Sequence, residues 1–84
     1  MEAHEARLNV TYQGQNGDLP DPVDFDASDG DVRQWATEAV QAGGIPGLPA
    51  GDANFRDFVV DRFTPTEDRP YNLIQLRPKT PFGL

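Results

Sequence analysis

The segment 24–31 holds the chain's most conspicuous potential chemistry, because half of its eight positions are aspartates. Such a density of carboxylates is typical of a calcium-binding loop. Counted from Asp24, however, the glycine comes one position late, and the twelfth position, where a bidentate acid is required, is Trp35. We therefore expect these acids to protect a strand edge and to cap a helix.

Other catalytic and metal-binding chemistry has little support. His4 is the single histidine, and one imidazole is too few ligands for a metal site. The absence of cysteine removes thiol catalysis, disulfides and cysteine-based zinc sites. No histidine lies in the expected folded region to activate a hydroxyl group. We expect no catalytic residue, no metal and no cofactor, and hence a protein that is not an enzyme.

Charge is distributed unevenly along the 84 residues, whose formal net charge is -7. Segment 18–31 carries six aspartates and no basic residue, whereas Arg69, Arg77 and Lys79 follow the last acid, Asp68. Excess negative charge opposes binding to nucleic acid or to an anionic membrane. No apolar run approaches the roughly 18 residues of a membrane span, and the first five residues lack signal-peptide features. We expect a cytoplasmic protein.

The first half of the chain predicts two strands, after a flexible leader at residues 1–5. Residues 7–12 alternate polar and apolar side chains, as does segment 22–27. Between them, the glycines and the Asn-Gly pair of residues 14–18 predict a reversing loop. The sequence thus predicts an opening antiparallel hairpin.

A helix is expected to follow, because Ser28 precedes the acid Asp31 by three residues, in a pattern close to a capping box. Gly43 and Gly44 supply a stop signal. Apolar residues at helical spacing predict one buried stripe, in which Trp35 would be the core plug between helix and sheet. The stripe consists of Val32, Trp35, Ala36, Ala39 and Val40.

Two more strands are expected in the second half. Segment 55–63 fits a helical stripe as well as a strand, but its short length and β-branched pair favour a strand. Residues 71–77 form the clearest strand of the chain, and the prolines of segment 78–84 predict an extended tail. The fold class is therefore α+β: a single domain at residues 6–77, in which one helix packs on one face of a mixed four- to five-stranded sheet.

This order of elements resembles the ubiquitin-like β-grasp family over residues 7–83. The resemblance rests on the opening hairpin, the amphipathic helix after an acidic cap, the Gly-Ile-Pro stretch at residues 44–46, and the final strand that runs into a tail with a glycine near its end. The chain is more similar to the small ubiquitin-like proteins of bacteria than to ubiquitin itself.

The resemblance implies a protein modifier whose tail is the reactive part. In such modifiers the terminal glycine is adenylated, passed to a cysteine of an activating enzyme and joined to an amine, so Gly83 would be the acyl donor, with Pro81 and Phe82 leading to it. Phe82 stands where ubiquitin has a second glycine, and Leu84 lies beyond Gly83. Leu84 would be removed by a processing peptidase, or it is a residue left from an affinity tag. The partners implied are activating and conjugating enzymes, and we expect a monomer.

An alternative is a β-grasp protein-protein interaction module that is never conjugated. Its partner would bind the sheet face that bears Ile74 and Leu76, or an acidic partner would bind the basic ending at Arg77 and Lys79. A structural role for the same strand, with both faces covered by its own domain, is equally compatible with its apolar residues.

Overall fold

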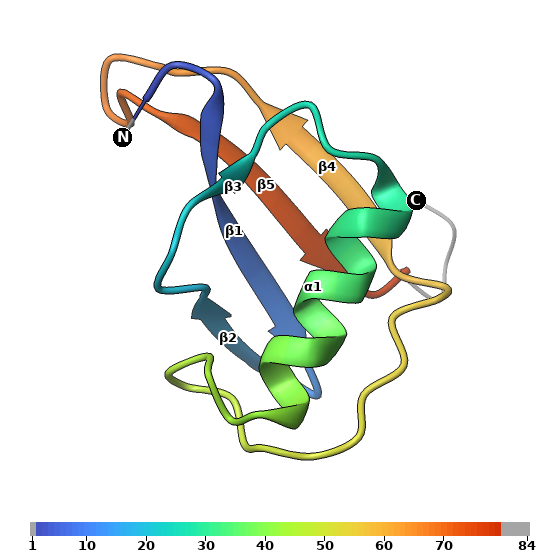
Figure 1. Cartoon of the computed structure of the whole chain (residues 1–84). Coiled ribbons are helices and arrows are strands. Elements are labelled where there is room, and N and C mark those ends of the chain that lie inside the picture. Colours follow the sequence, from blue (N-terminus) through green and yellow to red (C-terminus); the bar gives the residue numbers. More distant parts are fainter. Residues whose placement is uncertain (1, 80–84) are drawn as a thin grey trace.

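The structure is a computed structural model, and it describes residues 2–79. One helix lies across one face of a mixed sheet, as the sequence predicts for the α+β class (Figure 1). The elements, in chain order, are β1 (Glu5–Tyr12), β2 (Gln15–Asp18), β3 (Val23–Asp24), α1 (Asp29–Gln41), β4 (Val59–Phe63) and β5 (Asn72–Arg77).

The sheet has the strand order β2-β1-β5-β4, and the short β3 also pairs with β1. The central strands β1 and β5 run parallel, with Leu8 opposite Ile74, while the other pairs are antiparallel. A parallel pair requires a long crossover, and here the crossover contains α1. In this order the last strand, β5, lies between β1 and β4 and pairs with both.

The opening hairpin turns earlier than the sequence predicts. Gln13 and Gly14 both have positive φ, of 52° and 76°, and they form a two-residue turn that sets Tyr12 opposite Gln15. Residues 15–18, which the sequence predicts to be loop, are therefore strand β2, and that prediction was wrong. Strand β2 could not be predicted from hydrophobic alternation, because its residues Gln-Asn-Gly-Asp include no apolar side chain.

The predicted strand at residues 22–27 is reduced to the two residues of β3. The Asp24 side chain accepts a hydrogen bond from the Asp26 backbone N–H at 3.0 Å, and the Ala27 N–H donates to the Asp24 carbonyl at 3.2 Å. This local turn competes with strand pairing, so the chain leaves the sheet after Asp24.

Helix α1 begins and ends where the sequence signals predict. Ser28 is its N-cap, and the hydroxyl accepts a hydrogen bond from the Asp31 N–H at 3.1 Å. At the other end, Gly43 has a φ of 70° and donates to Val40, while Gly44 donates to Ala39. These two bonds form a Schellman motif, which positive φ at glycine makes inexpensive.

The core between α1 and the sheet is built without Trp35. Phe55 is the largest fully buried side chain, and its ring packs edge-on against Tyr12 and Phe58 at centroid distances of 5.3 and 4.9 Å. Trp35 is partly exposed and lies outside the core cluster, so its prediction as the core plug was wrong. The buried core consists of Ala6, Leu8, Val10, Val32, Ala36, Val40, Ile45, Leu48, Phe55, Ile74 and Leu76.

The position of Trp35 on the helix explains this. At about 100° per residue, Trp35 lies about 60° from Val32, on the side away from Ala36 and Val40. It therefore stands at one flank of the apolar stripe, while Arg33 stands at the other flank and donates from its guanidinium to the Phe58 carbonyl at 2.8 Å.

Segment 55–63 is a strand only in its second half. A turn closed by the Phe58 N–H and the Phe55 carbonyl precedes β4, and the Asn54 side chain accepts from the Arg56 N–H. The choice of strand over helix is confirmed for residues 59–63. At the start of the sheet, β1 begins at Glu5, inside the segment expected to be a leader.

Candidate functional site

Ile74 and Leu76, two residues predicted to face a partner, are both fully buried. They lie on the side of β5 that α1 covers, next to Leu8 and Val10 of the parallel strand β1. Because the chain's own helix occupies this face, their prediction as partner-binding residues was wrong. Their role is in the core.

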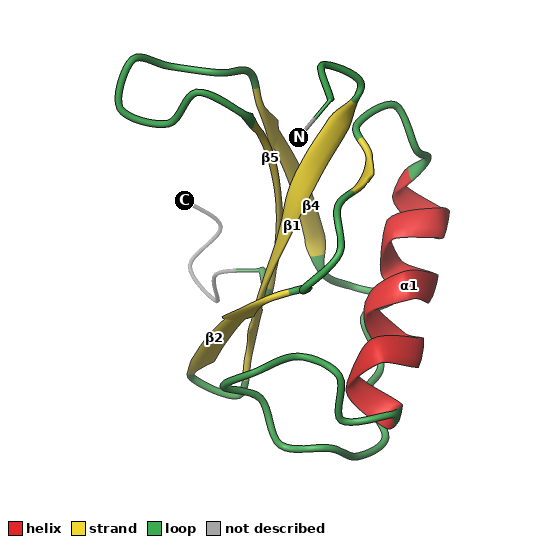
Figure 2. Cartoon of the chain, turned by 60° about the vertical axis from the view of Figure 1, so that its left-hand side comes forward, coloured by secondary structure: helices red, strands yellow, loops and turns green. Residues whose placement is uncertain are grey.

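The opposite face of the sheet has no helix over it in the part of the chain that the structure describes (Figure 2). Side chains alternate along each strand, so the strand positions between the buried ones point to this side. We call it the open face, and it includes Arg7, Asn9, Thr11, Asn16, Asp18, Val59, Asp61, Phe63, Leu73, Gln75 and Arg77.

One half of the open face, over β1 and β2, is a network of amides. The Asn9 amide donates to Asn16 and to Asp18, each at 2.8 Å, and the Asn16 amide donates back to Asn9 and to Thr11, also at 2.8 Å. Arg7 extends the network with an ion pair to Asp18 at 3.5 Å. The Asn9, Asn16, Thr11 and Asp18 side chains satisfy one another, which makes this half of the face a structural surface, while the Nε of Arg7 is buried without a hydrogen-bond partner.

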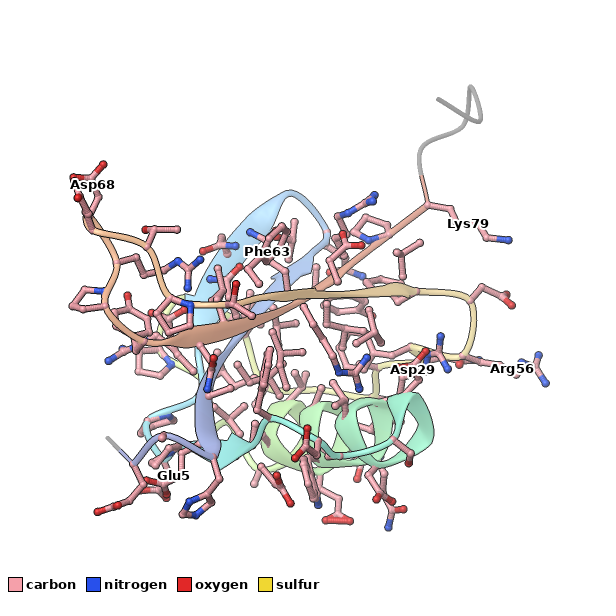
Figure 3. The ribbon with its side chains drawn as sticks, turned by 90° about the horizontal axis from the view of Figure 1, so that it is seen from above. Glu5, Asp29, Arg56, Phe63, Asp68 and Lys79 are labelled. Atoms are coloured by element: carbon pink, nitrogen blue, oxygen red, sulfur yellow. The ribbon has the colours of Figure 1, made fainter. Side chains whose placement is uncertain are left out.

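The other half, over β4 and β5, carries an exposed apolar pair. Phe63 is 41% exposed and stands directly opposite Leu73 in the strand register. Figure 3 shows Phe63 on the side of the sheet away from the helix. Along β5 the pair is followed by Gln75 and by Arg77, whose Nε donates to Asp61 at 2.7 Å. The sequence analysis did not predict Phe63 as a binding residue. The alternation of Leu73 with Ile74 was a usable signal, because it gives β5 a second apolar position on the face away from the helix.

The chain leaves the sheet at the end of β5 through Pro78 and Lys79, which are both exposed. Lys79 lines a hollow of about 320 Å³ beside the start of α1, together with Asp29, Arg33 and Arg56. In Figure 3, Lys79 lies at the end of the sheet opposite Asp68. The other predicted tail residues, Pro81, Phe82 and Gly83, lie outside the described residues.

An ion pair and two cation–π contacts hold the neighbours of β5 near the start of that strand. Arg62 of β4 pairs with Asp29 in the first turn of α1 at 2.7 Å, which ties the helix to the edge strand. Near the start of β5, the guanidinium groups of Arg7 and Arg69 lie 5.3 and 5.7 Å from the centre of the Tyr71 ring. At the exit itself, β5 is held by its pairing with β1 and β4 and by the ion pair between Arg77 and Asp61.

The arrangement offers binding chemistry. Within residues 2–79, no three His, Asp or Glu side chains lie close enough together to hold a metal ion. No helix in the same range is long and apolar enough to span a membrane. Two surfaces suited to binding are the Phe63–Leu73 pair, beside Arg7 of β1, and the exposed exit at Lys79.

No protein-family model, no curated protein and no solved structure gives a significant match to this chain.

Proposed function

We propose that this chain is a ubiquitin-like modifier: a β-grasp domain whose tail glycine, Gly83, is activated and conjugated by partner enzymes. One observation carries the proposal. The last strand, β5, is paired in parallel with β1 at the centre of a mixed sheet under one helix, and it ends in the exposed Pro78 and Lys79. This arrangement is compatible with a β-grasp and supports a donor tail that leaves from a rigid strand.

The proposed reaction needs no catalytic group in this chain. After a peptidase removes Leu84, a Gly83 carboxylate oxygen attacks the α-phosphorus of ATP and releases pyrophosphate. A cysteine thiolate of the activating enzyme then attacks the acyl adenylate, and AMP leaves. Finally an amine attacks the thioester, forming an amide bond and releasing the thiol. The absence of cysteine in this chain means that the sulfur belongs to its partners.

The geometry suits such a substrate. Because β5 has a neighbour on each side, the start of the tail has a fixed position, and an enzyme that holds the domain also holds the tail at its exit. Glycine at the reacting position lets the enzyme backbone approach without a side-chain collision. Lys79 gives the exit a positive charge for an acidic channel entrance, whereas the charge of Arg77 is paired with Asp61.

A second candidate function, a non-conjugated interaction module, is favoured by the exposed Phe63–Leu73 pair. An aromatic side chain that is 41% exposed beside an apolar neighbour is a suitable anchor for a partner protein. The two candidates differ in whether the tail reacts.

The decisive test uses protein that ends at Gly83, ATP and the activating enzymes of the same organism. We expect ATP–pyrophosphate exchange and a thioester that thiols reverse. Gly83→Val should abolish the thioester, because a β-branched side chain collides where glycine fits. Gly51→Val is the matched control, since a Cβ at Gly51 meets no atom within 4 Å. Equal thioester formation by Gly83→Val and wild type, or no exchange with any such enzyme, would make the modifier proposal wrong.

A further inference from the structure

A groove lies along the flank of α1 that bears Trp35, and it shares no lining residue with the hollow at Lys79. Its volume is about 430 Å³, within the range of sites that accept small ligands or single long side chains. Figure 1 shows the β2–β3 segment on one side of α1 and β4 on the other. The groove lies on the β2–β3 side and is lined by Leu19, Asp21, Pro22, Val23, Asp24, Trp35 and Glu38.

The groove combines an apolar wall with carboxylates. Leu19, Pro22, Val23 and Trp35 supply the wall. Trp35 is the chain's single tryptophan. It is partly exposed at the groove, because other large side chains fill the core. A partly exposed indole that lines a groove is a good partner for a cation, because the electron-rich ring attracts positive charge.

The carboxylates have no cationic partner within the described residues. None of the three ion pairs there uses Asp21, Asp24 or Glu38, and no Lys, Arg or His within residues 2–79 lines the groove. The hydrogen bonds that two of them accept come from neutral groups, the Asp26 N–H at 3.0 Å and the Gln34 amide at 3.2 Å.

The negative charge of Glu38 also interacts unfavourably with the dipole of α1. It lies in the last turn of α1, where the dipole favours basic residues, and that turn contains none. A cation bound in the groove would offset both the mutual repulsion of the acids and their unfavourable position.

We propose that this groove binds a basic segment of a partner protein, which places an arginine or lysine side chain over Trp35 and an apolar neighbour against Pro22 and Leu19. The charge complementarity selects a cation. The apolar wall selects a peptide with apolar residues beside its basic ones, rather than a bare cation, because only such a segment covers the wall. This site is separate from the tail and independent of conjugation.

The test uses the intact chain and the acetylated, amidated peptide Leu-Arg-Leu-Arg-Leu. Because Trp35 is the single tryptophan, its fluorescence reports occupancy of the groove directly. We expect a saturable change that weakens as salt is raised from about 50 to about 500 mM. The peptides Leu-Gln-Leu-Gln-Leu and Gly-Arg-Gly-Arg-Gly, which lack the charge and the apolar residues respectively, should bind at least about fivefold more weakly.

Variants locate the site. Glu38→Gln and Asp21→Asn should each weaken binding about two- to fivefold, and Trp35→Leu should do the same when binding is followed by calorimetry. Glu67→Gln is the matched control, because it removes the same charge in the β4–β5 loop and lines no part of the groove. Thermal unfolding of each variant checks that the fold is intact.

Three results would overturn the proposal. The first is no saturable change with the basic peptide. The second is equal binding of the neutral peptide, or an equal loss in Glu67→Gln and Glu38→Gln, which would indicate unspecific attraction. The third is a fluorescence change with protein concentration alone, which would assign the groove to a second copy of the chain. None of these results bears on the reaction of the tail, so the two proposals fail separately.

Discussion

The two faces of the central strands β1 and β5 differ in burial and in polarity, although they share a backbone. On the face under α1, Leu8 and Ile74 are fully buried. On the open face, the neighbouring positions Asn9 and Gln75 are polar and partly exposed. The covered face stabilises the domain, whereas no helix within residues 2–79 lies over the open face (Figure 2). The exposed aromatic side chain of the open face, Phe63 beside Leu73, is where a partner surface is expected.

The largest effect on stability should come from truncating a buried side chain on the covered face. Leu76→Ala removes a fully buried side chain under α1 and should lower the free energy of unfolding by about 2–5 kcal/mol. Its neighbour on the open face, Gln75, is the control, and Gln75→Ala should cost less than about 0.5 kcal/mol. Urea denaturation followed by circular dichroism measures both. Equal losses would contradict the division between the faces.

The next effect concerns the close contact at the edge of the covered face. A Cβ on Gly17 of β2 would lie 2.3 Å from the Pro46 carbonyl oxygen and 2.8 Å from Ile45. Gly17→Ala should therefore push the loop after α1 away and cost about 1–3 kcal/mol. The same urea titration tests this, and Gly51→Ala, at an open position, should leave the midpoint nearly unchanged.

A smaller effect is expected within the amide network of the open face. Asn9→Ala removes the donor to Asn16 and Asp18 and should cost about 1 kcal/mol, because water replaces part of what is lost. Amide hydrogen exchange of the β1–β2 pair should speed up while the β4–β5 pair keeps its protection. Uniform acceleration across the sheet would mean that the network does not act locally.

The smallest effect on stability should come from the exposed apolar pair. Phe63→Ser loses a cross-strand contact with Leu73 and should cost less than about 1 kcal/mol. If the chain is an interaction module, the same variant should lose its partner in pull-down experiments, while Gln75→Ala keeps it. A stable Phe63→Ser protein that retains every partner would remove the open face from the binding account.

Local signals predicted the parts of the fold that short-range chemistry determines. Neighbouring residues alone were enough to predict three features: the cap at Ser28, the stop at Gly43 and the strand at residues 72–77. Strand β2 was missed because its polar residues pair with β1 through the turn at Gln13 and Gly14, and nothing in its own pattern shows that pairing.

The candidate sites could not be predicted from the sequence, because their positions depend on packing between residues that are far apart in the chain. Phe55, from a loop, fills the core, so the indole of Trp35 stays at the flank of the helix. Phe63 reaches the open face because β4 pairs with β5 in one particular register. A shift of one residue would have buried it.

The central claim, that Gly83 is joined to other proteins, is tested most directly by mass spectrometry of proteins from the native host after trypsin digestion. Trypsin cleaves after Lys79 and spares Arg77, because a proline follows Arg77. Conjugation therefore predicts target lysines that carry the remnant Thr80-Pro81-Phe82-Gly83, together with free protein that ends at Gly83. Recovery of the chain only in free form, with Leu84 still attached and no lysine bearing the remnant, would contradict the claim.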